Sequence, residues 1–263
     1  MKLNAASRFF GAIILVLILV SSCKKDSVNT DEEEYVPPTV TGPSYSFSRY
    51  DGNGLLKIQK TFAYYVDPFK GLVETITKEA KASFKNSPFD SLYSNAAAVS
   101  CQGKTLALQN NQTYLLDGSA AANISVTTTL GVNWNVTGNS VTGIPGFLYT
   151  TTKPLPEYKG VANNSMPTTI RRAAGLTLSL GANIVGADSI FLSITSGSKT
   201  IKKMIGGFEN ECIFSPAELS VLPSADGAAL LQVSPISYEL SVQGSKKMYF
   251  ANQASYTKLV NVE

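Results

Sequence analysis

The chain has 263 residues, of which 44% are hydrophobic and 16% are charged, and its formal net charge is +3. From Tyr35 onward, 18 Lys and Arg residues stand against 14 Asp and Glu residues, too small an excess for a nucleic-acid-binding surface. The chain contains no histidine, which excludes Ser-His-Asp and Cys-His catalytic arrangements and metal sites built on imidazole. We therefore expect no nucleic acid partner, no cofactor, no metal site and no catalytic activity.

The first 22 residues have the pattern of a secretory signal peptide. Lys2 and Arg8 form a short cationic start, and residues 9–20 form an apolar run that ends at Ser21-Ser22-Cys23. A helix needs about 20 apolar residues to cross a bilayer, so this run is too short for a lasting membrane span. We predict that the chain is cut before Cys23.

The residues around the predicted cleavage point carry a resemblance. Val20-Ser21-Ser22-Cys23 resembles the lipobox of bacterial lipoproteins, in which an aliphatic residue and two small ones precede the acylated cysteine. The resemblance implies that Cys23 carries lipid and that a membrane is the first partner of the mature chain. Two or more acyl chains, at about 0.8 kcal/mol per buried methylene, make a stable anchor.

Residues 23–44 are predicted to form a flexible tether. The segment contains the acidic run Asp31-Glu32-Glu33-Glu34 and the turn-forming pairs Pro37-Pro38 and Gly42-Pro43, with few apolar residues to bury. Lys24-Lys25-Asp26 and the acidic run resemble the charged segments of Bacteroidota-type surface lipoproteins. The resemblance implies the outer membrane, on its periplasmic or cell-surface face. The same acids also fit a merely solvated linker.

Residues 45–165 are predicted to form a β-rich domain. Two alternating runs, 45–50 and 55–60, flank the glycine-rich residues 51–54 and indicate a hairpin. A short helix is expected between Asp67 and Phe84, because apolar residues recur there every four positions. These residues are Leu72, Ile76, Ala80 and Phe84.

Further strands are expected along the rest of this domain. Residues 96–108 alternate around Gln102-Gly103 and indicate a second hairpin. Three more strands are predicted at residues 114–116, 124–130 and 132–137. Residues 138–169 are rich in Gly, Pro, Asn and Thr, and we expect a long surface connection there.

Residues 166–263 are predicted to form an immunoglobulin-like β-sandwich. Apolar and polar residues alternate in short runs whose spacing is typical of that fold. Ser215-Pro216-Ala217-Glu218 is a capping box with proline at the first helical position, so a short helix should run to about Leu222. The predicted strands are 176–180, 190–195, Ile201, 230–233, 237–242 and 248–251. In Bacteroidota-type lipoproteins such modules serve as spacers, adhesive units or accessories to glycan uptake, which the resemblance implies as roles.

Cys101 and Cys212 allow two interpretations. An exported protein favours oxidised thiols, so the two residues could form a disulfide between the predicted domains. Both also fit apolar strand positions as buried free thiols.

Aromatic residues define a candidate ligand surface. Trp134, the only tryptophan, alternates with polar neighbours in Val-Asn-Trp-Asn-Val and fits either core packing or a sugar-stacking platform. Tyr149 and Tyr158, together with Tyr64 and Tyr65, could widen such a platform.

Three classes of function follow from these residues. The first is a non-catalytic binding, adhesive or structural module, favoured by the absence of histidine. The second is a glycan-binding accessory lipoprotein, which requires an exposed Trp134 or tyrosine patch. The third is a glycoside hydrolase that uses Glu209 or Glu211, which requires a second acid across a cleft.

Overall fold

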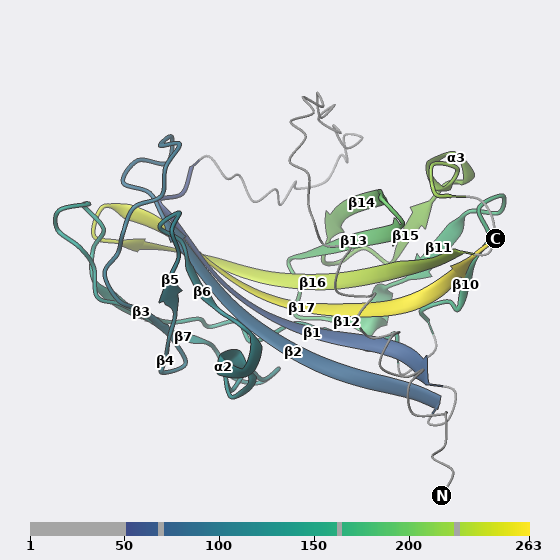
Figure 1. Cartoon of the computed structure of the whole chain (residues 1–263), viewed down its shortest axis with the longest axis horizontal. Helices are drawn as coiled ribbons and strands as arrows, with labels where there is room; N and C mark the ends of the chain where they lie inside the picture. Colours follow the sequence, from purple (N-terminus) through teal and green to yellow (C-terminus); the bar gives the residue numbers. More distant parts are fainter. Residues whose placement is uncertain (1–50, 68–70, 162–164, 224–226) are drawn as a thin grey trace, which may run out of the picture. The chain divides into compact units, whose positions relative to one another are not determined.

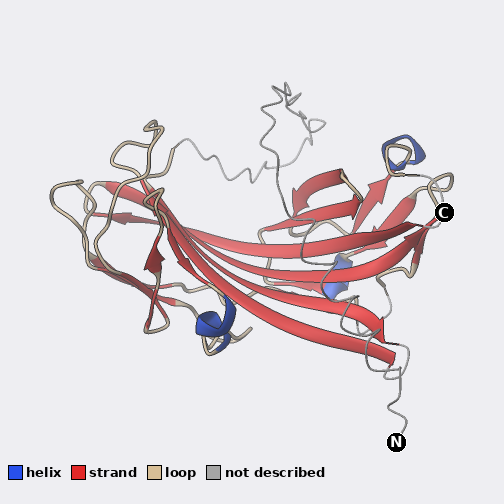
Figure 2. Ribbon diagram, in the orientation of Figure 1, coloured by secondary structure: helices blue, strands red, loops and turns tan. Residues whose placement is uncertain are grey.

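Strands dominate the computed structural model, which describes residues 51–67, 71–161, 165–223 and 227–263 (Figures 1 and 2). Strands account for 54% of the described residues and helices for 6%, which confirms the prediction of a mainly β fold. The predicted signal peptide, Cys23 and the tether lie outside the described residues. The described residues from both predicted domains, 45–165 and 166–263, fall in one compact unit.

The largest sheet has nine strands in the order β14-β13-β16-β17-β1-β2-β6-β5, and β10 pairs with β17 outside this path. β1 and β17 are parallel neighbours over 11 paired positions, from Gly54 opposite Met248 to Tyr64 opposite Lys258. Strands from both predicted domains therefore share one sheet. The bounds are β1 Gly54–Asp67, β2 Gly71–Phe84, β5 Ala107–Leu108, β6 Tyr114–Leu116, β10 Thr169–Ile170, β13 Ser189–Ser196, β14 Lys199–Gly206, β16 Gly227–Gln243 and β17 Lys246–Val262.

β16 and β17 form one long hairpin. Gly244 closes it with a φ of +60°, a conformation that glycine adopts without steric cost. The sequence predicted two strands, 230–233 and 237–242, where the structure has β16 alone. The pairing of β16 with β17 skips Ser234 and Pro235, because proline has no N–H to donate to a sheet.

The predicted helix between Asp67 and Phe84 is wrong, because this segment forms β2 and pairs with β1 as an antiparallel hairpin. A spacing of four is also a multiple of the two-residue period of a strand, so Leu72, Ile76 and Ala80 lie on one face of either structure. The β-branched residues Thr75 and Thr77 favour the strand.

The predicted hairpin, in which residues 45–50 would pair with residues 55–60, is also ruled out. β1 has β17 along one edge and β2 along the other, so no edge of β1 is left for a third strand. Residues 45–50 themselves lie outside the described part of the chain.

A four-stranded sheet in the order β4-β3-β7-β8 lies near one end of the large sheet (Figure 1). The predicted turn at Gln102-Gly103 is confirmed, with φ values of +49° and +72° between β3 and β4. The strand predicted at residues 124–130 is not formed, and the strand at 132–137 is present as β7. The bounds are β3 Val99–Cys101, β4 Lys104–Thr105, β7 Asn133–Val136 and β8 Phe147–Thr150.

Two strand pairs and three short helical segments complete the described elements. Ser215 caps α3 through a capping box, in which its hydroxyl accepts from the Glu218 N–H, as the sequence predicted. The pairs are β11 with β15 and β9 with β12. The bounds are β9 Glu157–Tyr158, β11 Leu176–Ser179, β12 Ile184–Val185, β15 Glu211–Phe214, α2 Gly118–Ala122, α3 Pro216–Leu219 and the 3-10 helix η2 Gly181–Asn183.

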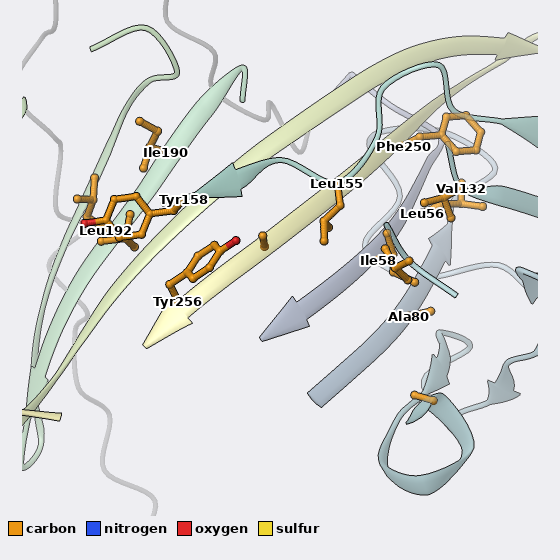
Figure 3. Close-up of a cluster of buried hydrophobic side chains, with 14 of the residues drawn as sticks. Leu56, Ile58, Ala80, Val132, Leu155, Tyr158, Ile190, Leu192, Phe250 and Tyr256 are labelled. Carbon is orange, nitrogen blue, oxygen red and sulfur yellow. The ribbon is translucent and has the colours of Figure 1, made fainter. Parts of the chain in front are cut away.

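The core lies on one face of the large sheet. Leu56 and Ile58 of β1 and Phe250 of β17 are buried in a cluster that also contains Val132 and Leu155 from the connections outside the sheet (Figure 3). The other face carries polar residues of the same strands, and the hydroxyls of Ser234 and Ser255 hydrogen-bond there at 2.8 Å. Burial of the apolar face supplies the main stabilisation, at roughly 25 cal/mol per Å².

Candidate functional site

The outer edge of β2 is open over most of its length. On the inner side β2 pairs with β1 from Gly71 to Phe84. On the outer side β6 pairs only with Ala80–Ala82. Among the described strands, none pairs with the outer edge between Gly71 and Glu79, so backbone N–H and C=O groups are free there to bind another strand.

The side chains along this open edge favour contact with a partner. Leu72 and Ile76 lie on one face of β2 and are both exposed. Between Leu72 and Thr77 the only charged residue is Glu74. By contrast β14, the strand at the far edge of the sheet, carries Lys199, Lys202 and Lys203, and lysines on an edge strand oppose pairing with other chains.

A groove of about 550 Å³ adjoins the open edge. Its lining includes the paired segments 59–61 of β1 and 76–79 of β2, together with Asp117, Gly118 and Ala122. Lys78 connects the two sides, because its Nζ donates to the carbonyl oxygens of Ala122 at 2.9 Å and Ile124 at 2.7 Å. A segment that extended the sheet along β2 would reach this groove at Ile76.

Lys60 provides the second cation of the groove. It is the residue opposite Lys78 on β1, and its Nζ lies 4.7 Å from the centre of the Phe62 ring. Burial lowers the pKa of Lys60, the neighbouring Lys78 lowers it further, and Glu74 opposes both effects. An anionic group that entered the groove would relieve the repulsion between the two amines.

Aromatic rings continue the same face of the sheet beyond the groove. Phe62 stacks on Tyr256 with ring centres 4.7 Å apart, and Tyr158 of β9 meets Tyr256 edge to face at 5.6 Å. Tyr64 donates to Oε1 of Glu74 at 2.5 Å. Burial, and secondly this hydrogen bond, raise the pKa of Tyr64. Figure 3 shows Tyr158 and Tyr256 next to each other over the sheet.

The predicted stacking platform is not assembled around Trp134. Trp134 is 1% exposed and Tyr158 is buried, so neither ring offers a face to a sugar. Tyr149 is occupied as well, because it stacks on Phe250 at 4.1 Å and donates to Glu239 at 2.8 Å. Alternation along β7 places Trp134 on the inner side, between Cys101 of β3 and Tyr149 of β8.

The two predicted acids do not line the groove beside β2. Glu211 is exposed on β15 opposite Ser179 of β11, and Glu209 lies in the turn that follows Phe208. The residues that matter at the open edge, Leu72 and Ile76, were assigned to a helix by the sequence. The β-branched residues between them were the signal that could have identified a strand.

The disulfide considered for Cys101 and Cys212 is not formed. Both residues are buried free thiols, one in β3 of the four-stranded sheet and the other in β15. Burial raises the pKa of Cys101 to about 12 and that of Cys212 to about 11.

We therefore expect both thiols to be unreactive in the folded chain. A chain that begins at Lys24 should react with a disulfide-exchange reagent only after denaturation, because the thiolate is the reactive form and both sulfurs are shielded. The measurement is the release of reagent chromophore with and without urea. A mass that rises on reduction would contradict the assignment of free thiols.

Among the described residues there is no cluster of acidic or cysteine side chains suited to a metal ion, and no helix has the length and hydrophobicity to cross a membrane. Comparison of the chain with protein family models, curated proteins and solved structures gives no match.

Proposed function

We propose that this protein is an exported lipoprotein, acylated on Cys23 and held at the outer membrane, that acts as a non-catalytic binding module. The signal pattern of residues 1–22 and the lipobox-like Val20-Ser21-Ser22-Cys23 support the export and the anchor. The polar residues 23–44 would separate the folded body from the lipid.

The binding mode that we propose is addition of a strand to β2. The observation that carries the proposal is the unpaired edge from Gly71 to Glu79 beside the exposed side chains of Leu72 and Ile76. An extended segment of a partner protein would gain main-chain hydrogen bonds along this edge and side-chain contacts at alternate residues.

The groove indicates the chemistry of that segment. Apolar residues four positions apart would lie opposite Leu72 and Ile76, and an acidic residue two positions beyond the one opposite Ile76 would meet Lys78 and Lys60. The partner is therefore an extended polypeptide in which two apolar residues lie four positions apart and an acid lies two positions beyond one of them.

The test replaces the exposed apolar residues by lysine. We expect the double variant Leu72→Lys/Ile76→Lys to lose the binding of peptides selected from a displayed random library, because charges on an edge strand oppose pairing. The free energy of unfolding should change little, since both side chains are exposed. Hydrogen exchange should show that selected peptides protect the amides of residues 72–77.

A matched control lies on the opposite edge of the sheet. Met204→Lys adds a charge to an exposed residue of β14 and should leave peptide binding unchanged. Selection that yields no peptide, or peptides that protect amides elsewhere, would exclude strand addition at β2.

The immunoglobulin-like sandwich predicted for residues 166–263 also belongs to this proposal. Contact between the pair β11-β15 and the edge of the large sheet supports a two-layer arrangement. Lys203 of β14 donates to the Ile213 carbonyl at 2.6 Å, and its Nζ lies 5.1 Å from the centre of the Phe214 ring.

A further inference from the structure

Exposed apolar side chains gather on the loops at one end of the large sheet. Phe89 is 83% exposed, Leu92 is 78% exposed and Val141 is 93% exposed. The first two lie in the loop after β2, and the third lies in the connection from β7 to β8. Figure 1 shows both loops at the end of the sheet where β1 begins. A group of exposed apolar side chains on adjoining loops indicates a surface that another apolar phase covers.

Hydrogen bonds join these loops into one surface, which we call the loop end: residues 51–53, 85–95, 139–146 and 243–247. The side chain of Asn53 donates to the Asn86 carbonyl at 2.9 Å and accepts from the Lys247 N–H at 3.1 Å. Lys246 donates to Oδ1 of Asn86 at 2.8 Å. The hydroxyl of Thr142 donates to the Asn95 carbonyl at 2.5 Å. The exposed loops are therefore supported by the ends of β1, β2, β16 and β17.

Polar and aromatic groups lie around the apolar tips. Lys85 has its Nζ 5.8 Å from the centre of the half-exposed Tyr93 ring, and Lys246 and Lys247 are the first two residues of β17. The acids of the loop end are already engaged: Asp51 accepts from Tyr249 at 2.6 Å and Asp90 accepts from the Ser87 N–H at 2.8 Å. Apolar tips backed by tyrosine and lysine are the arrangement that suits the boundary between lipid headgroups and acyl chains.

The position of the proposed lipid anchor indicates what the loop end binds. Residues 1–50, which include Cys23, join the described chain at Asp51, and Asp51 belongs to the loop end. A lipid on Cys23 would therefore tether the domain to the bilayer through this end. We propose that Phe89, Leu92 and Val141 insert into the lipid surface and fix the orientation of the anchored domain. This inference rests on the lipoprotein part of the proposed function.

An orientation with the loop end on the membrane would also affect the open edge of β2. The free segment Gly71–Glu79 lies toward the end of β2 opposite to the loop end, because Phe84 pairs with Gly54 and Asp67 with Gly71. The free edge would then be held away from the bilayer, where a partner can reach it.

The test measures lipid binding without the anchor. A chain that begins at Lys24 lacks the lipid and retains the whole compact unit Thr39–Glu263. We expect it to sediment with phosphatidylcholine vesicles, and the double variant Phe89→Ser/Leu92→Ser to partition at least about tenfold less, because two apolar side chains no longer leave water. The matched control Leu148→Ser/Phe208→Ser changes the same residue types at exposed positions outside the loop end and should partition like the unmodified chain.

A second readout gives the position of the loop in the bilayer. Trp134 is buried, so a tryptophan placed by Phe89→Trp should be quenched by brominated lipids and one placed by Phe208→Trp should not. No sedimentation of the unmodified chain, or equal losses in both double variants, would overturn the inference. The anchor is judged separately, by membrane retention of the full-length chain with and without Cys23→Ala, so failure of insertion and failure of acylation give different results.

Discussion

Replacement of Cys23 by alanine should move most of the protein from the membrane to the soluble fraction. The thioether and the amino group of a lipidated N-terminal cysteine carry the lipid, and alanine offers no sulfur for the thioether bond. At about 0.8 kcal/mol per buried methylene, the acyl chains contribute far more membrane affinity than the loop tips Phe89 and Leu92 can supply. The measurement is the mass of the membrane-extracted chain and the distribution of wild type and Cys23→Ala between membrane and soluble fractions.

The lipobox-like residues 21 and 22 are both serine already, so a serine substitution cannot provide a control there. Cys101→Ala is the matched control, since it removes a thiol from the folded body and leaves the lipobox-like residues intact. A mature chain that starts at Cys23 and carries acyl mass is the expected product. An unacylated chain cut elsewhere would contradict the anchor, and with it the orientation inferred from Asp51.

Local patterns in the sequence predicted the parts of the fold that depend on neighbouring residues. The hairpin turn at Gln102-Gly103 and the capping box at Ser215 were predicted correctly, because both depend on a few adjacent residues. The mainly β character followed from two-residue alternation in the second half of the chain.

Long-range pairing was not accessible in the same way. β1 and β17 lie nearly 200 residues apart in the sequence, as the pair Gly54 and Met248 shows. Nothing in either segment identifies the strand with which it pairs. Local spacing does not reveal that two such distant segments share a sheet.

The sequence did not reveal the candidate site, because the spacing of apolar residues in β2 fits both a helix and a strand. In β2 the apolar residues Leu72, Ile76 and Ala80 fit a helix and a strand equally, and the open edge becomes visible only when β1 occupies one side and β6 stops at Ala80. The loop end could not be identified from the sequence. Only the fold shows that Phe89 and Leu92 are exposed, since apolar residues in a sequence do not reveal which of them are buried.

The unfolding of a Trp134→Ala variant tests the packing of the four-stranded sheet against the large one. Trp134 is 1% exposed and is the largest fully buried side chain of the described residues. Removing a buried aromatic ring costs about 3–5 kcal/mol through lost burial and the cavity that remains. We expect urea denaturation, followed by far-ultraviolet circular dichroism, to show a loss of that size, and Leu148→Ala on the outer side of the neighbouring β8 to show almost none.

Trp134→Phe separates ring packing from hydrogen bonding. The indole Nε1 of Trp134 is buried without a hydrogen-bond partner, so phenylalanine gives up no hydrogen bond and removes a polar group that is costly to bury. Its loss of stability should therefore be clearly smaller than that of Trp134→Ala. A Trp134→Ala variant that unfolds like wild type would contradict the buried position, and the sugar-stacking role of this ring would then become the better explanation for a lone tryptophan on β7.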